Sequence, residues 1–172
     1  MGFWGTKVLI RTTSDLTAVP VLTELLGGEL DSAWNEPTGW ALASLHRADY
    51  PDVTQVVALA AAVNGPVLTA YIADSDCAIL QFASPGTAPH WGVLHAEFAL
   101  EMGFDGVPTA NETYAHLTEW VGAPLDETAV TEALTTELTF AEDTFLLLAD
   151  SLGALEPGSL QDRVFGSLDP DE

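Results

Sequence analysis

The chain has 172 residues, of which 48% are hydrophobic, and this length and composition predict one globular domain with a core of its own. Twenty-six acidic residues face four basic ones, so the formal net charge at pH 7 is −22. A negative field of this strength repels nucleic acid and anionic lipid, which argues against a nucleic-acid-binding protein and against a membrane-surface protein.

Further features narrow the class of protein that the sequence predicts. No apolar run approaches the roughly 18 residues that mark a membrane-spanning helix. The N-terminus does not show the charged start, apolar core and cleavage site of a secretory signal. Cys77 is the single cysteine, so an internal disulfide is excluded, and a reducing, cytoplasmic location is the default expectation.

The first part of the chain alternates strand and helix signals. Residues 3–13 predict a strand, and residues 16–26 predict a helix that Ser14-Asp15 caps and Gly27-Gly28 ends. Residues 33–46 predict either two short strands or one strand after a loop.

The centre of the sequence predicts a helix followed by a β-hairpin. The helix covers residues 52–63 and ends at Asn64-Gly65. The hairpin pairs residues 67–73 with residues 77–82 around the turn residues Asp74-Ser75-Asp76. Both runs are apolar at nearly every position. This is typical of central strands that are covered on both faces, or of strands with helices on one face and a partner on the other.

After the hairpin the sequence becomes mainly helical. A short strand or loop is predicted at residues 91–94, followed by a helix that runs to Met102. Thr109 and Glu112 have the spacing of a capping box, in which each side chain bonds to the other residue's backbone N–H, and they predict the start of another helix.

Two more helices and a tail complete the chain. Asp126 is the predicted cap of a helix over residues 127–138. Thr139 and Glu142 repeat the capping-box spacing ahead of a helix over residues 143–152, although one long helix through Thr139 stays open. Residues 156–172 contain glycine and proline and predict a loosely ordered acidic tail.

The candidates for chemistry are two aspartates and two histidines. Asp74 and Asp76 lie at the predicted hairpin tip, where a carboxylate pair could serve acid–base catalysis or bind a cation, but turns also favour aspartate. His90 and His95 are one residue away from the spacing that places two metal ligands on one helical face. We therefore assign no catalytic residue, metal ligand or cofactor, and an enzyme or metal-binding protein with a cryptic site at these four residues stays an alternative.

The acidic residues of the C-terminal part carry the main functional signal. Residues 95–172 hold seventeen acids and one base, a net charge of −16, whereas residues 1–94 carry −6. An ordinary solvated surface mixes both signs, because a field of one sign strains the fold by self-repulsion. The sequence predicts a partner-binding field that consists of Glu112, Glu119, Asp126, Glu127, Glu132 and Glu137.

Three segments resemble a group of small acidic proteins from high-GC actinobacteria: the opening MGFWGT with Arg11, the run DSDCAIL, and the run TFAEDTFLLLADSLGAL. The resemblance covers most of the chain. It implies no activity and no site residues. In size and acidity the chain is also similar, in general type, to the immunity proteins of bacterial toxin systems.

Together these patterns predict an α+β fold in a single domain of residues 1–155. A mostly antiparallel sheet of about four to six strands occupies residues 3–94, is packed by helices, and is followed by a helical subdomain at residues 95–153. The predicted function is that of a cytoplasmic, non-catalytic acidic inhibitor or immunity protein that occludes a basic toxin, nuclease or nucleic-acid-binding partner. A structural homo-oligomer such as a homodimer, and a salt-adapted protein, stay open as alternatives.

Overall fold

The fold is built on one six-stranded antiparallel sheet. The computed structural model describes residues 2–12 and 20–165. Along the sheet the strands follow the order β2-β3-β1-β4-β5-β6, and every neighbouring pair is antiparallel. The strands are β1 (Gly5–Arg11), β2 (Glu29–Asn35), β3 (Trp40–His46), β4 (Val67–Ala73), β5 (Cys77–Ala83) and β6 (His90–Leu94).

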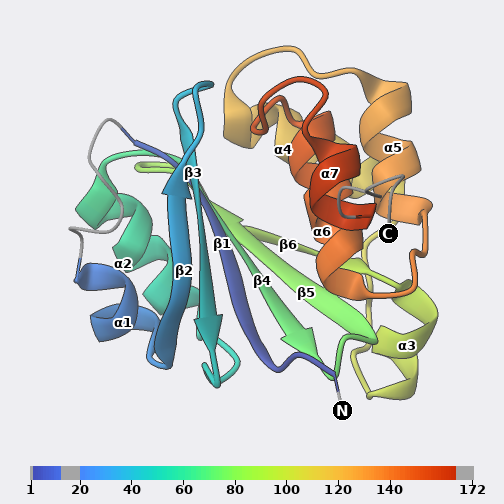
Figure 1. Ribbon diagram of the computed structural model, residues 1–172, viewed down its shortest axis with the longest axis horizontal. Helices are drawn as coiled ribbons and strands as arrows, with labels where there is room; N and C mark the ends of the chain where they lie inside the picture. The colour runs from blue at the N-terminus through green and yellow to red at the C-terminus, as the bar shows by residue number, and fades with distance from the viewer. Residues whose placement is uncertain (1, 13–19, 166–172) are drawn as a thin grey trace, which may run out of the picture.

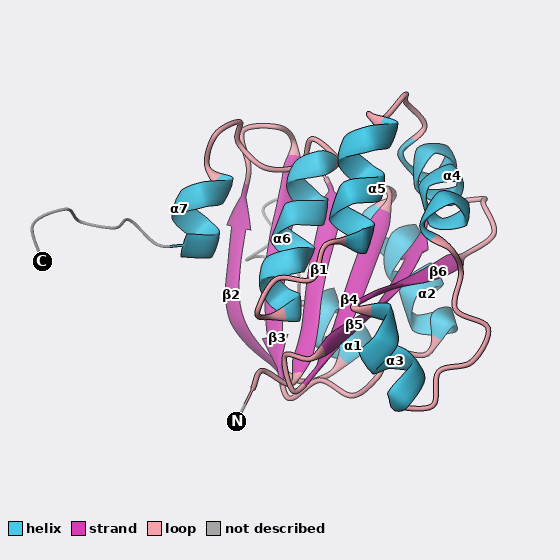
Figure 2. Cartoon of the chain, turned by 90° about the vertical axis from the view of Figure 1, so that its right-hand side faces the viewer, coloured by secondary structure: helices cyan, strands magenta, loops and turns pink. Residues whose placement is uncertain are grey.

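Helices cover the sheet on both faces, so that the molecule has three layers. The helices are α1 (Val21–Leu26), α2 (Val53–Val63), α3 (Ala96–Glu101), α4 (Ala110–Val121), α5 (Glu127–Thr135), α6 (Ala141–Ser151) and α7 (Leu160–Phe165). Figure 1 shows α1 and α2 on one face, and α4, α5, α6 and α7 on the other. This arrangement confirms the predicted α+β fold, and the C-terminal helices form the layer over the second face (Figure 2). In the described part of the chain, no helix has the length and apolar character needed to cross a membrane.

The alternation of side chains along each strand gives the molecule a core on each face of the sheet. In β1, Val8 belongs to the cluster under α1 and α2, whereas Leu9 belongs to the cluster under the C-terminal helices. Val67 and Leu68 divide between the two faces of β4 in the same way. Burying one such side chain contributes about 1.5–3 kcal/mol. The prediction that the hairpin strands are covered on both faces is confirmed, since all of β5 is buried.

The β4–β5 turn contains residues in a backbone conformation that residues other than glycine rarely adopt. Asp74 and Ser75 have φ values of 52° and 63°, and the Ala73–Cys77 pair closes the hairpin below them. Two successive residues in the left-handed region match the right-handed twist of the flanking strands. Asp74 is exposed and Ser75 is buried, so the turn folds back against the rest of the molecule.

Ser75 joins this turn to two segments that are distant in the sequence. Its backbone N–H donates to the carbonyl of Phe3 at 3.1 Å, and its carbonyl accepts from the N–H of Ala141 at 2.8 Å. Its Oγ accepts from the N–H of Phe3 at 2.7 Å and donates to Oε1 of Glu142 at 2.8 Å. One buried residue thus fixes both the N-terminal arm and the start of α6.

Most of the predicted helix ends are confirmed. Thr109 and Glu112 form the capping box that begins α4, and Asp126 accepts from the N–H of Ala129 at the start of α5. Asn64 ends α2 in a left-handed conformation. Residues 33–46 form parts of two strands, of which β2 begins earlier than predicted, at Glu29. The predicted cap Ser14-Asp15 lies outside the described residues.

The predicted capping box at Thr139 and Glu142 is wrong. Phe140 is the N-cap of α6 and provides no side-chain cap. The first helical N–H, that of Ala141, instead bonds to the carbonyl of Ser75, and the Glu142 carboxylate also bonds to Ser75. Helix α5 ends at Thr135 rather than at Leu138, its C-cap Thr136 takes an extended conformation, and the two helices are separate.

The prediction of a loosely ordered tail at residues 156–172 is wrong for residues 160–165, which form α7. Arg163 donates to the buried carboxylate of Glu36 at 2.6 Å and lies over the ring of Trp34 at 5.7 Å. Glu36 also accepts from the N–H of Glu156 at 3.0 Å. This buried ion pair was not predictable from local sequence patterns, because its partners are more than one hundred residues apart.

The Ser75→Ala substitution tests the role of this residue in the fold. It removes the acceptor of the Phe3 N–H and the donor to Glu142, so we expect the free energy of unfolding to fall by about 1–3 kcal/mol. Urea unfolding measures the change. The control is Thr87→Ala, an exposed hydroxyl within one short turn, which we expect to change stability by less than about 0.5 kcal/mol. Equal effects of the two substitutions would contradict the role given to Ser75.

Candidate functional site

The six acids predicted as a partner-binding field are all exposed on the C-terminal helical layer. They come from α4, from α5 and its N-cap, and from the segment between α5 and α6. In chain order they are Glu112, Glu119, Asp126, Glu127, Glu132 and Glu137. A partner-binding role requires that these acids are exposed, and they are. That they bind a partner stays a prediction.

Two members of this field also stabilise helix ends. The Glu112 carboxylate accepts from the N–H of Thr109 at 2.8 Å, and these hydrogen bonds from Thr109 hold the pKa of Glu112 below its usual value. Asp126 accepts from the N–H of Ala129 at 3.0 Å. The other four acids can therefore be changed with the least risk to the fold.

The basic residues do little to neutralise this field. Within residues 2–12 and 20–165, Arg163 and Glu36 make the one ion pair between side chains. The guanidinium of Arg11 lies over Trp40, and the amine of Lys7 bonds to Ser44 inside the structure. The acids on the outer helices thus face solvent with their charge largely uncompensated.

A second exposed feature was not predicted from the sequence. Five large apolar side chains surround the β4–β5 turn or lie on and after the adjacent α3, with 42–53% of their surface exposed. We call this set the turn-end patch, and its members are Trp4, Phe98, Leu100, Met102 and Phe140. Single exposed apolar residues are ordinary, but several at one end of a molecule are typical of an interaction surface.

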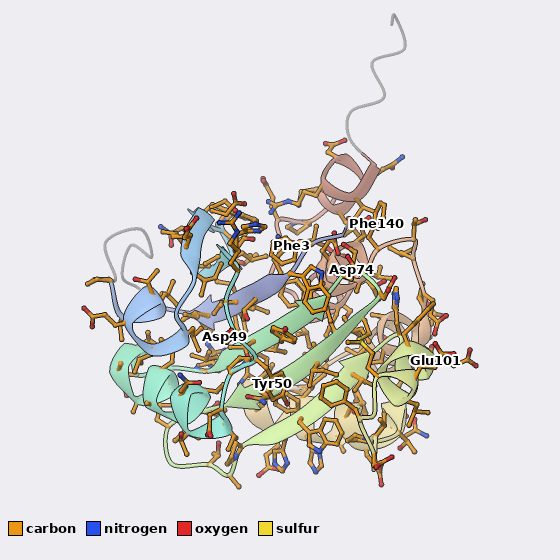
Figure 3. All side chains as sticks on the ribbon, turned by 90° about the horizontal axis from the view of Figure 1, so that it is seen from below. Phe3, Asp49, Tyr50, Asp74, Glu101 and Phe140 are labelled. Atoms are coloured by element: carbon orange, nitrogen blue, oxygen red, sulfur yellow. The ribbon has the colours of Figure 1, made fainter. Side chains whose placement is uncertain are left out.

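Contacts to the turn connect members of the turn-end patch. The indole N–H of Trp4 donates to Asp74 at 3.2 Å, and the sulfur atoms of Met102 and Cys77 are 3.4 Å apart. Phe140 directly precedes Ala141, which bonds to Ser75. Figure 3 looks onto this end of the molecule, where Phe140 and Asp74 lie in one region and Glu101 marks α3.

Exposed acids lie around the turn-end patch and link it to the predicted field. Asp74, Asp76, Glu97 and Glu101 are exposed on the turn and on α3. Glu137, a member of the predicted field, lines a hollow of about 250 Å³ together with residues of α3 and α4. Glu137 and α3 therefore place one member of the acidic field beside the helix that carries part of the turn-end patch.

The cryptic catalytic or metal site considered at Asp74, Asp76, His90 and His95 is not assembled. Asp74 binds the N–H of Gly2 at 2.7 Å, whereas His95 bonds to the backbone carbonyl of Asp76 and to Thr144, each at 2.8 Å. His95 is buried at the junction of β6 and α3. No group of three or more metal-ligating side chains occurs in the part of the chain that the structure describes.

His90 takes part in a different contact, at the other end of β6. Its ring stacks on the ring of His116, with 3.7 Å between centroids and 9° between planes. Burial lowers the pKa of His90, His116 lowers it further, and Glu119 opposes the shift. Because the pKa of His90 is lowered in the folded chain, part of the stability depends on pH.

Cys77 is not an activated nucleophile. Its thiol is buried, and burial followed by the nearby charge of Asp76 raises its pKa to about 11. A catalytic cysteine needs the opposite shift, because the thiolate is the reactive form.

Lys7 is a functional candidate that the sequence analysis did not select. It lines a cavity of about 170 Å³ between the sheet and α6, together with Glu142 and Asp143. Burial lowers the pKa of Lys7, against the opposing charges of Glu142, Asp31 and Asp143. The available signal in the sequence was the single lysine beside the apolar run at residues 8–10, which does not reveal the carboxylates more than one hundred residues away.

The stacked histidines give a pH-dependent prediction. The pKa of folded His90 lies below the ordinary 6.5, so below that pH the unfolded chain binds the proton more readily and the folded state loses stability. We expect His90→Gln to remove this contribution, so that wild type loses stability relative to the variant between pH 7 and pH 5. Urea unfolding of both proteins at the two pH values measures the difference. A stability difference that is the same at both pH values would contradict the prediction.

Comparisons with protein-family models, with curated proteins and with solved structures found no match to the chain.

Proposed function

We propose that this chain is a cytoplasmic, non-catalytic acidic binding protein of the inhibitor or immunity type, and that it occludes a basic protein partner. The observation that carries the proposal is the turn-end patch, in which large exposed apolar side chains lie among exposed acids. The acids of α4 and α5 extend the same charge over the adjacent helical layer.

The two parts of this region have different roles in binding. Exposed apolar side chains that become buried on association provide most of the affinity, because a few large residues usually dominate an interface. The outer acids raise the local concentration of a positively charged partner and accelerate the encounter. Apolar contacts thus determine how long the complex lasts, and the acidic field determines how fast it forms.

Charge complementarity favours a basic protein over a second copy of the chain. Two copies would each bring a formal charge of −22, and their acids would meet around the patch. Like charges brought together in this way oppose association. A nucleic acid is disfavoured for the same reason.

The test begins with capture of proteins from a lysate of the organism that encodes the chain, at low salt, with three immobilised proteins. These are the wild type, a patch variant (Phe98→Ala, Leu100→Ala, Met102→Ala) and a field variant in which Glu119, Glu127, Glu132 and Glu137 are changed to Lys. A basic protein held by the wild type and lost by both variants is the expected result. A partner held equally by all three would contradict the proposal.

Kinetics with the captured partner then separate the two roles. We expect the field variant to associate roughly tenfold to a hundredfold more slowly at low salt, and the patch variant to dissociate at least about tenfold faster. Surface plasmon resonance measures both rates.

A matched variant controls for net charge. Changing Glu24, Glu29, Glu156 and Asp162 to Lys removes as much negative charge from exposed positions elsewhere. If this control slows association as much as the field variant does, net charge alone is responsible and the proposed contact field is wrong.

A further inference from the structure

The cavity beside α6 holds an amine that the proposed function does not use. Lys7 is the only lysine of the chain. Its side chain lines the cavity of about 170 Å³ with the apolar residues Trp34, Leu42, Phe145 and Leu146 and with the carboxyl groups of Glu142 and Asp143. Lys7, Trp34 and both acids are half-buried, so the cavity is accessible from solvent.

The amine of Lys7 is held in one place. It donates to Oγ of Ser44 at 2.8 Å, and Ser44 lies directly opposite on β3. It also lies 4.4 Å from the ring centroid of Phe3, whose backbone is fixed by Ser75. Because burial lowers its pKa, a larger fraction of this amine is neutral and nucleophilic at pH 7 than in an ordinary lysine.

The two carboxyl groups complement this amine. Oε1 of Glu142 accepts from Ser75, but Oε2 is buried and has no hydrogen-bond partner among the described residues. Burial raises the pKa of Asp143, Glu142 raises it further and Lys7 opposes the shift, so Asp143 holds a proton more often than an ordinary aspartate at the same pH. The cavity therefore combines a nucleophile, a free acceptor and an acid.

We propose that this cavity takes up small uncharged aldehydes and holds them reversibly as an imine on Nζ of Lys7. The lone pair of the neutral amine attacks the carbonyl carbon, so that a C–N bond forms as the π bond of the carbonyl breaks. Glu142 accepts the proton that the nitrogen loses and passes it to the oxygen, which becomes a hydroxyl. Asp143 then protonates the hydroxyl, which leaves as water as the C=N bond forms. Aldehyde and amine give imine and water, and no oxidant or reductant is needed.

The volume and the charge of the cavity determine which aldehydes can enter it. At roughly 30 Å³ for each water-sized group, the cavity has room for about five non-hydrogen atoms. Glu142 and Asp143 stabilise the cationic protonated imine, and they repel carbonyl compounds that carry a carboxylate. A short aliphatic aldehyde such as propanal fits these limits, and the glyoxylate anion does not.

The test is reductive trapping of the purified chain with propanal and cyanoborohydride at pH 7, followed by peptide mapping. Apart from Lys7, the primary amine that can form a reducible imine is the N-terminal one, and it serves as the internal reference. We expect Lys7 to be trapped about tenfold faster, relative to that reference, in the folded chain than in the same chain in urea. Trapping of Lys7 that is equal or slower in the folded chain would overturn the proposal.

Variants and a second probe test the assigned roles. Glu142→Gln and Asp143→Asn should each slow trapping at Lys7 without affecting the N-terminal amine, whereas Asp150→Asn, farther along α6, should leave both rates unchanged. With glyoxylate in place of propanal, we expect Lys7 to be trapped no faster in the folded chain than in urea, relative to the N-terminal amine. If all three variants behave alike, or if folding accelerates both probes equally, the cavity does not select aldehydes in the proposed way.

Discussion

The hydrogen bonds of Ser75 are the constraint on which both ends of the chain depend. This buried turn residue binds the Phe3 backbone on one side, and the Ala141 N–H and the Glu142 carboxylate on the other. It thereby places Phe3 under the Lys7 amine and fixes the start of α6. Trp4 and Phe140 of the turn-end patch adjoin these contacts in the sequence, and so does Asp143 of the cavity, so the turn helps to position parts of both.

The fold tolerates an unusual charge because the acids lie outside a core that does not depend on them. Three apolar clusters, distributed over the two faces of the sheet, contain most of β4 and β5. Solvent and salt screen the repulsion among exposed carboxylates. The stabilisation from buried apolar surface is not weakened by such screening. The one buried ion pair, between Arg163 and Glu36 in the described residues, serves to dock α7. The exposed acids can thus serve a function without being needed for the stability of the core.

Local patterns in the sequence predicted most of the fold, and contacts between distant residues explain where prediction failed. The Thr109 and Asp126 caps were predictable because a cap is made within three residues. The Thr139–Glu142 spacing suggested the same motif, but Ser75 supplies those contacts instead. The turn-end patch and the Lys7 cavity were missed for a related reason. Exposure of Phe98 or burial of Lys7 depends on which helix covers which part of the sheet, and no periodicity encodes that.

We propose that the fold presents exposed apolar anchors within an acidic field. Hydrogen exchange of the chain with and without its captured basic partner tests this claim most directly, because it maps the buried surface without mutation. The account predicts that protection on binding is concentrated in residues 96–105 and 137–142 and extends into α4 and α5. Protection confined to α1, α2 or the β2 edge, with the turn-end patch unchanged, would contradict it.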